Sequence, residues 1–284
     1  MTHPLSLALA QLCAEPYEAA KNRSLTLEAS ARAFEMGADI VVLPEMILQG
    51  YVADKSRLAP LAETVPGPTT KAWQQLAADH GKYICGGLCE RDGNDLYNTA
   101  VLVGPSGVAL HYRKLHLFGD EKVTFRQGDR GLPVVHTSFG TVGICVCYDL
   151  RFVEVVRALT LKGADLILVP TAWLPGFDQQ RWDADGMCPQ AYGALFQSNL
   201  SQCFIACASQ VGRHGGSEFL GSSIVADPYG KRALGPLPMD AEDITVVELD
   251  MAQAKLAQVR STLIAPRADR RRDVYGIAID GDIL

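Results

Sequence analysis

The sequence predicts an α/β protein in which two mixed β-sheets are covered by helices. Short runs rich in Val, Ile and Leu alternate with stretches of helical spacing, which is the pattern of βαβ units. Residues 94–114 instead indicate a hairpin, because two alternating strands flank a turn at 105–107. Strands of both kinds in one chain favour mixed sheets. No repeat, linker-like tract or change in composition divides the chain, so we predict a single domain over residues 1–284.

The individual elements follow from these patterns in chain order. Strands are expected at 5–12, 39–44, 82–90, 96–103, 108–113, 141–147, 165–170, 203–208 and 222–227. Helical spacing of Ala, Leu and other apolar residues predicts helices at 17–37, 67–80 and 150–162. Gly37 and Gly163 directly follow two of these helices and are expected to end them.

Charge and hydropathy exclude several classes of protein. The 26 Lys and Arg residues against 32 Asp and Glu give a formal net charge of −6, whereas a general nucleic-acid-binding protein would present a basic face. The longest apolar run, 166–175, contains two prolines and is too short to cross a bilayer, which takes about 20 residues. We therefore predict neither a nucleic-acid partner nor a membrane.

Cysteine usage indicates reduced thiols. The 8 cysteines are too few for a disulfide scaffold in a chain of 284 residues. The N-terminal segment has no Lys or Arg at its start, and Gln11 interrupts its apolar stretch, so it does not resemble a signal peptide. We expect a cytoplasmic protein. The cysteine spacings are CxxxC and CxC, and no phosphate-binding or GxSxG motif is present, so neither a metal nor a cofactor is predicted.

One acid, one amine and one thiol each follow a different predicted strand. Glu45 comes after 39–44, Lys114 comes after 108–113, and Cys147 ends the run 141–147. Residues just beyond the carboxyl ends of strands line the ligand crevice of α/β proteins. These three side chains can therefore meet in one site. Taken singly, they can also be a surface acid, a lysine whose stem covers apolar surface, and a core cysteine.

The three residue types suit nucleophilic catalysis. A thiol attacks as the thiolate, and we expect a helix N-terminus and the Lys114 cation to lower the pKa of Cys147. Burial at a strand end is expected to raise the pKa of Glu45, which then serves as general base and general acid. Lys114 and the backbone N–H of Tyr148 are expected to stabilise an oxyanion, which is typically worth about 3–4 kcal/mol per donor.

Three motifs, one around each of these residues, resemble the motifs of a known family. VVLPEM around Glu45, HYRKLHLF around Lys114 and GICVCYDLRF around Cys147 resemble the motifs of the carbon–nitrogen hydrolase (nitrilase) superfamily, in which Glu, Lys and Cys form a triad in that chain order. Further agreement at 166–173, 221–230 and 269–276 extends the resemblance over nearly the whole chain. It implies an amidase-like member with the αββα sandwich fold and no cofactor. It also implies a homodimer or higher homo-oligomer, to whose contacts the tail 260–284 contributes.

The same resemblance implies a reaction. Cys147 attacks an amide carbonyl, Glu45 passes protons, Lys114 holds the oxyanion, and water cleaves the resulting thioester. Many members have a second glutamate between the lysine and cysteine motifs. Here Asp120 and Glu121 are the candidates, and Glu121 is preferred. The segment 175–189 looks individual to this chain.

The substrate pocket is expected beside the triad motifs. Its candidate residues are Tyr51, Phe118, Arg151 and Trp173. Arg151 can instead form a structural ion pair with Asp149 or Glu154. The local arginine suggests a small aliphatic amide or a carboxylate-bearing ω-amide. A nitrilase, an N-carbamoyl amidase, a catalytically idle scaffold and a thiol redox protein remain as alternatives.

Overall fold

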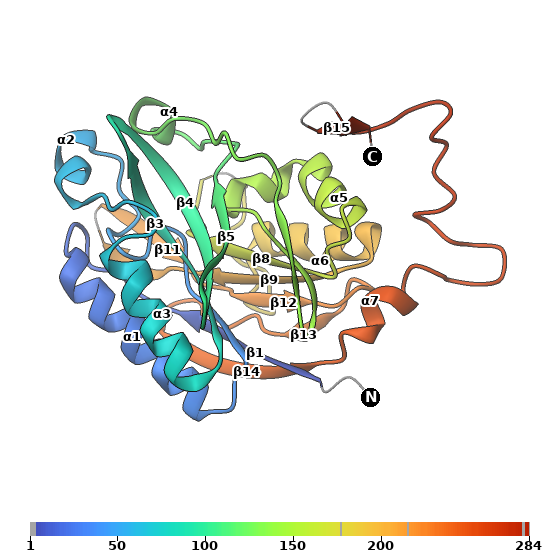
Figure 1. Cartoon of the computed structure of the whole chain (residues 1–284), viewed down its shortest axis with the longest axis horizontal. Coiled ribbons are helices and arrows are strands. Elements are labelled where there is room, and N and C mark those ends of the chain that lie inside the picture. Colours follow the sequence, from blue (N-terminus) through green and yellow to red (C-terminus); the bar gives the residue numbers. More distant parts are fainter. Residues whose placement is uncertain (1–3, 177, 215, 280–281, 284) are drawn as a thin grey trace.

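Two six-stranded sheets pack against each other, and helices cover their outer faces (Figure 1). The computed structural model describes residues 4–176, 178–214, 216–279 and 282–283. The arrangement is a four-layer αββα sandwich of mixed sheets, so the predicted fold class is confirmed.

The first sheet holds the N-terminal half of the chain and one late strand. In sheet order its strands are β14 (Asp243–Leu249), β1 (Leu5–Gln11), β2 (Ile40–Val42), β3 (Tyr83–Asp92), β4 (Asp95–Gly104) and β5 (Gly107–Arg113). Strands β1, β2 and β3 are parallel, and the remaining pairs are antiparallel. The predicted hairpin is confirmed as β4 and β5, whose register pairs Thr99 with Arg113.

The second sheet holds most of the C-terminal half. In sheet order its strands are β13 (Arg232–Leu234), β12 (Ile224–Ala226), β9 (Phe204–Ser209), β8 (Leu166–Thr171), β7 (Gly140–Ile144) and β6 (Val134–Thr137). Strands β7, β8 and β9 are parallel. A separate hairpin follows β9 and consists of β10 (Val211–His214) and β11 (Ser217–Leu220). Two short paired strands of two residues each, β15 (Ala278–Ile279) and β16 (Asp282–Ile283), lie near the C-terminus.

Four longer helices form the outer layers. Helices α1 (Ala19–Glu35) and α3 (Pro68–His80) cover the first sheet, and α5 (Val153–Leu161) and α6 (Pro189–Ser201) cover the second. The shorter helices are α2 (Lys55–Leu58), α4 (Glu121–Thr124), α7 (Ala252–Leu256) and the 3-10 turns η1 (Ala59–Leu61) and η2 (Cys147–Arg151). Gly37 and Gly163 have positive φ just after α1 and α5, as predicted for residues that end a helix.

The alternation of side chains along β1 explains how the layers assemble. Leu5, Leu7 and Leu9 are buried in the core that includes the second sheet. Ala8 and Ala10 point to the other face and are buried beneath α1 and α3. Because successive side chains of a strand point to opposite faces, one short segment supplies large residues to the inner core and small residues to the helix layer.

Several predicted boundaries are wrong, and two of them affect the site. The strand expected at 39–44 is only Ile40–Val42, and the strand expected at 141–147 ends at Ile144. The helix expected at 150–162 is divided into η2 and α5. Helix α6 was not predicted from its sequence, because it begins with Pro189 and has many polar residues and a glycine. The edge strands β6, β13 and β14 were missed as well.

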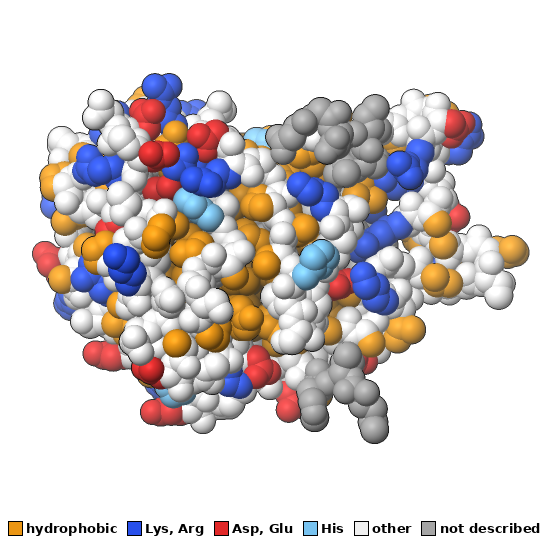
Figure 2. Space-filling view, viewed as in Figure 1, with side chains coloured by type: hydrophobic (Ala, Val, Ile, Leu, Met, Phe, Trp, Pro, Cys, Tyr) orange, Lys and Arg blue, Asp and Glu red, His pale blue; other side chains and the backbone are white. Residues whose placement is uncertain are grey.

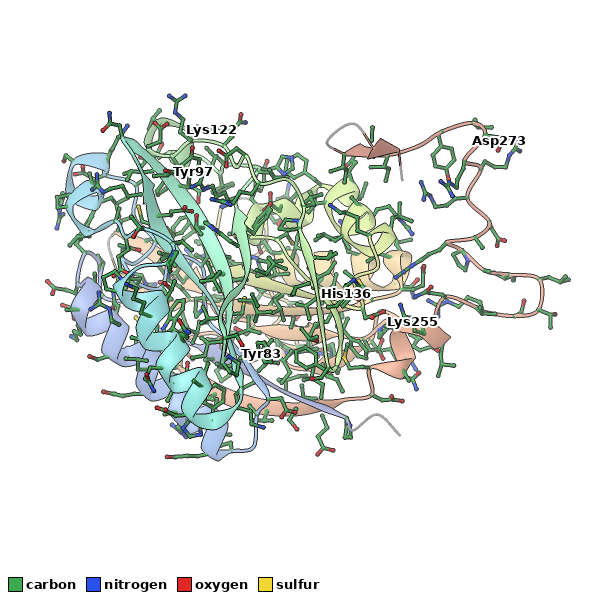
Figure 3. All side chains as sticks on the ribbon, viewed as in Figure 1. Tyr83, Tyr97, Lys122, His136, Lys255 and Asp273 are labelled. Atoms are coloured by element: carbon green, nitrogen blue, oxygen red, sulfur yellow. The ribbon has the colours of Figure 1, made fainter. Side chains whose placement is uncertain are left out.

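The views show the distribution of side chains on one face and the course of the tail. Hydrophobic side chains gather in the middle of the face in Figure 2, where β5 lies beside the second sheet, and charged side chains lie mostly around it. Tyr97 and Tyr83 lie at opposite ends of the β3–β4 pair (Figure 3). After α7 the chain extends away from the sheets and carries Asp273 outward (Figure 3).

Candidate active site

The backbone of Glu45 is held between the two sheets. It follows β2, and its N–H donates to the carbonyl of Thr171 on the second sheet at 3.2 Å. The carbonyl of Glu45 accepts from Nε2 of Gln210 at 2.7 Å. Gly87 on β3 packs so close that a Cβ there would lie 2.5 Å from the backbone nitrogen of Met46 and 2.8 Å from Cα of Glu45. Only glycine at position 87 therefore leaves room for this approach.

Lys114 directly follows β5 and is positioned by its neighbours in the chain. The guanidinium of Arg113 donates to Glu90 at 2.6 Å and to Asp129 at 2.9 Å, which fixes the end of the strand. The backbone N–H of Lys114 donates to the carbonyl of Asn98 on β4 at 2.8 Å. The side chain then turns inward and is completely buried.

Two carboxylates and one ammonium group meet in the interior. Lys114 Nζ lies 2.7 Å from Oε1 of Glu45 and 2.9 Å from Oε1 of Glu121. Nδ2 of Asn98 donates to the same two oxygens, at 2.8 and 2.9 Å. Asp120, the other candidate for a second acid, is exposed. The structure thus brings Glu121 to the lysine, and it adds Asn98, which the sequence analysis missed.

This cluster perturbs the ionisation of its members. Burial, together with the charge of Glu121, raises the pKa of Glu45 to about 7, although Lys114 and Asn98 oppose the shift. Burial alone would lower the pKa of Lys114, but the charges of Glu121 and Glu45 raise it above its usual range. Lys114 is therefore an ammonium ion at neutral pH, whereas Glu45 is poised to gain or lose a proton.

The second carboxylate oxygen of Glu45 is arranged differently from the first. Oε1 accepts hydrogen bonds from Lys114 and Asn98, while Oε2 is buried and accepts from neither of them. The charge of Glu45 and a hydrogen bond between the two side chains raise the pKa of the Cys147 thiol, so these two groups lie next to each other. One carboxylate thus contacts both the ammonium group and the thiol.

Cys147 lies on a tight turn and not at the end of a strand. Strand β7 ends at Ile144, and Cys147 has a φ of 45°, in the left-handed region that non-glycine residues rarely adopt. Burial and the charge of Glu45 raise its pKa well above the usual range. The charge of Lys114 and a hydrogen bond from the backbone N–H of Ala172 lower this pKa, but they do not offset the increase. The expected lowering of this pKa is therefore wrong, and the resting group is a thiol.

Asp149 connects the cysteine turn to the lysine segment. Its Oδ2 accepts from the backbone N–H of Val146 at 3.0 Å and from the hydroxyl of Tyr112 at 2.7 Å. Its Oδ1 accepts from the backbone N–H of His116 at 3.0 Å and contacts Nδ1 of the same residue at 2.8 Å. The sequence suggested only an ion pair with Arg151 for this acid, although an aspartate in an apolar run is a signal for a buried hydrogen-bond acceptor.

A small pocket opens in front of Cys147. Its free space, with the open mouth included, is about 490 Å³. The four residues predicted to bind substrate all line it: Tyr51, Phe118, Arg151 and Trp173. Burial and the charges of Glu121, Glu45 and Cys147 raise the pKa of the Tyr51 phenol well above its usual range, so this group keeps its proton. Tyr148 and Gln190 complete the wall that faces the thiol.

Arg151 forms an ion pair with a carboxylate that sequence reasoning did not name. Its Nη2 lies 2.6 Å from Oδ2 of Asp178. Asp178 belongs to the segment 175–189, which looked individual in sequence. Sequence reasoning missed it because 27 residues separate the two side chains along the chain.

The described residues contain neither a metal-binding cluster nor a membrane-spanning helix. No group of three or more His, Cys, Asp or Glu side chains in this part of the chain is arranged to hold a metal ion. None of the helices in the same ranges is long and apolar enough to cross a bilayer. Cys145 and Cys147 are both free thiols, the first buried and the second half-buried.

Comparisons with known proteins find chains of similar sequence and similar fold. The sequence model of the carbon–nitrogen hydrolase family matches residues 6–258. The chain is 33% identical to a nitrilase of Pyrococcus abyssi over 95% of its own length and 99% of the relative, and 29% identical to an omega-amidase of Xenopus tropicalis over 95% and 96%. It is also similar to a variant of the amidase from Nesterenkonia sp. AN1 that carries the acetamide moiety of fluoroacetamide on its active-site cysteine. The TM-score is 0.77 at 26% identity, and 96% of each chain is covered.

Proposed function

Because the chain belongs to the carbon–nitrogen hydrolase family and is a hydrolase acting on amides, we propose that it converts small amides into acid and ammonia through a thioester on Cys147. Glu45 is the general base and acid, Lys114 and the backbone N–H of Tyr148 stabilise the oxyanion, and Glu121 is the second acid. The substrates are small aliphatic amides or ω-amides that carry a carboxylate.

One observation supports these roles above all others. Oε1 of Glu45 is held by Lys114 and Asn98, Oε2 is buried and bound by neither, and a hydrogen bond joins the Glu45 side chain to the thiol of Cys147. With a pKa near 7, Glu45 can accept a proton and return it at neutral pH. The nearby Cys147 is a thiol that needs a base before it can attack.

Acylation begins when the thiol proton of Cys147 moves to Oε2 of Glu45. The sulfur attacks the amide carbonyl carbon, the C=O bond opens, and the oxygen takes the negative charge. The ammonium group of Lys114 stabilises this oxyanion. When the C–O double bond re-forms, the C–N bond breaks, and the proton held by Glu45 passes to the leaving nitrogen, which departs as ammonia.

Deacylation uses the same groups in reverse. Glu45, again ionised, takes a proton from water, and the resulting hydroxide attacks the thioester carbon. The second oxyanion is stabilised by Lys114. The C–S bond then breaks, the carboxylic acid is released, and Glu45 returns its proton to the sulfur of Cys147. Because Lys114 remains an ammonium ion throughout, it never competes for the transferred proton.

Glu121 acts through the lysine and the pocket wall. Its Oε1 accepts from Nζ of Lys114, and its Oε2 accepts from the backbone N–H of Phe118 at 2.8 Å. It therefore fixes both the ammonium group and an aromatic residue of the pocket. We assign it a positioning role.

The reaction is tested with purified protein and a panel of short amides and ω-amides. Ammonia release is expected with the original chain and is expected to be lost in Cys147→Ala. Mass spectrometry of the enzyme quenched during turnover is expected to locate an acyl group on the peptide that contains Cys147. An intact rate in Cys147→Ala, or an adduct on another cysteine, would refute the assignment of the nucleophile.

A nitrile is the second candidate substrate, since a nitrilase is among the relatives. Matched nitrile, amide and N-carbamoyl compounds are distinguished by measuring ammonia, acid and carbon dioxide. A chain that releases none of these products from any of them would instead be a catalytically idle binding protein.

We also propose that the protein is a cytoplasmic homodimer to which residues 260–284 contribute contacts. The exposed apolar residues of this segment support the proposal, since Leu263 is 89% exposed and Val274 is 67% exposed. The segment extends from the body of the molecule (Figure 1). Light scattering should give twice the mass of the chain, and a variant that ends at residue 259 is expected to be a monomer.

A further inference from the structure

The pocket wall contains one cation, and a carboxylate outside the wall pairs with it. Of the described residues that line the pocket, Arg151 alone has a permanent charge. Its guanidinium lies 2.6 Å from the carboxylate of Asp178, and the two side chains are 36% and 31% exposed. The pair is therefore partly open to solvent beside the pocket, and its net charge is zero.

Asp178 is held in place by the segment that contains it. Arg181, three residues later, pairs with Glu218 on the β10–β11 hairpin at 2.6 Å. The indole N–H of Trp182 donates to the carbonyl of Leu220 at 2.8 Å. These contacts attach the segment to a second element of the fold, so the carboxylate does not depend on Arg151 alone for its position.

The charged side chains of the buried cluster also fail to attract a substrate carboxylate. Glu45 and Glu121 share the single cation of Lys114, so the cluster carries no net positive charge that would attract an anionic substrate. A substrate carboxylate that approaches Arg151 meets the negative charge of Asp178 at the same guanidinium, and like charges repel.

We propose that Asp178 is a specificity-determining residue, which neutralises Arg151 and makes this enzyme select amides with uncharged acyl groups over amides that carry a carboxylate. This inference rests on the proposed function. It separates the two substrate classes that the pocket otherwise leaves open, and it assigns the choice between them to the segment 175–189, which looks individual to this chain.

The experiment compares two amides of the same shape. Succinamate has a carboxylate at the end of its acyl chain, and 4-methylpentanamide has an isopropyl group in its place. We expect the original enzyme to have the higher kcat/KM for 4-methylpentanamide. Asp178→Asn keeps the size of the side chain and removes its charge. It is expected to raise the ratio of kcat/KM for succinamate to kcat/KM for 4-methylpentanamide about tenfold, the scale of one partly exposed charge contact.

Two controls separate charge from loop structure. Asp185→Asn removes another carboxylate of the same segment, one that pairs with Arg232 at 3.3 Å, and is expected to leave the ratio unchanged. In an Arg151→Met background, Asp178→Asn is also expected to leave the ratio unchanged, since the charge that it uncovers is absent.

The outcomes are distinct. A preference of the original enzyme for succinamate, or a ratio that Asp178→Asn does not raise, overturns the inference while amide hydrolysis stands. An equal rise of the ratio in the Arg151→Met background also overturns it, because opening of the segment would then be the cause. If the original enzyme and its variants hydrolyse no amide at all, the proposed function falls and this inference falls with it.

Discussion

Replacing Glu45 with glutamine is expected to stabilise the protein at pH 8, although it removes the group that we propose as the general base. At that pH the buried cluster contains two carboxylates, Glu45 and Glu121, and only one cation, Lys114. Glutamine keeps the shape of the side chain and can still accept the hydrogen bonds of Lys114 and Asn98. It removes the charge that has no counter-ion, which is costly in the interior.

The magnitude follows from the pKa of Glu45, which is about 7 in the folded protein and 4.5 for an ordinary glutamate. Below pH 4.5 both the folded and the unfolded chain hold the proton, and stability is unaffected. Between pH 4.5 and 7 the unfolded chain loses its proton first, so stability falls as pH rises, and the loss is complete above pH 7. A difference of roughly 2.5 between the two pKa values corresponds to about 3 kcal/mol.

Thermal unfolding at pH 5 and pH 8 measures this effect. For a chain of this size, about 3 kcal/mol corresponds to a Tm difference of about 5 °C or somewhat more. Glu45→Gln is expected to melt higher than the original protein at pH 8, and close to it at pH 5. The reasoning is wrong if the variant is less stable at pH 8, or if it is stabilised equally at both pH values.

A second buried glutamate provides a control of opposite sign. Burial alone would raise the pKa of Glu90, but hydrogen bonds from His111, Arg113 and Thr99 outweigh it and lower this pKa to about 2. Its ionised form therefore stabilises the fold above the ordinary pKa of 4.5, and this stabilisation is lost only as the pH falls towards 2. Glu90→Gln is expected to lower Tm at pH 8, where Glu45→Gln raises it.

Three further predictions concern the site. The pH profile of kcat/KM is expected to be bell-shaped and to rise through about pH 7 as Glu45 ionises. Its apparent pKa values belong to the Glu45–Cys147 pair and not to either residue alone. A flat profile between pH 6 and 9 would contradict this coupling. Gly87→Ala would bring a methyl group 2.5 Å from the backbone nitrogen of Met46, and the displacement of Glu45 is expected to lower kcat about 100-fold; an unchanged kcat at pH 7 would show that this strand tolerates the shift. Asp149→Asn places an amide N–H₂ group among the donors of a buried network, so it is expected to lower the free energy of unfolding, measured with urea, by about 2–3 kcal/mol. A decrease below about 1 kcal/mol would contradict this prediction.

Much of the fold was predictable because its signals are local. The runs around Leu7 and Val101 alternate between a core face and a helix face, and this alternation is visible in sequence. The hairpin of β4 and β5 was predictable from its turn residues. The edge strand β14 was not, because it pairs with β1 at the other end of the chain, and local sequence does not show which distant strand completes a sheet.

The candidate site divides in the same way. Glu45 and Lys114 were candidates because each is a charged residue that follows an apolar run, but this position also fits a surface acid and a surface lysine. The resemblance of the surrounding motifs to those of a family singled them out. Glu121 was one of two neighbouring acids, and only the turn that begins α4 brings it, and not Asp120, to the lysine. Asn98 gave no signal, since its role comes from lying opposite Lys114 across two paired strands.

The sequence by itself determined which kinds of chemical group the protein brings to the candidate site and which apolar runs these groups follow, because residue type and hydrophobic periodicity can be read along the chain. Only the tertiary structure decided their ionisation and their partners. A pKa depends on burial and on charges a few ångströms away, so the same cysteine that looked like a thiolate beside a helix is a thiol with a raised pKa on a left-handed turn. The pairing of Arg151 with Asp178 is likewise a property of distance in space, which separation along the chain does not reveal.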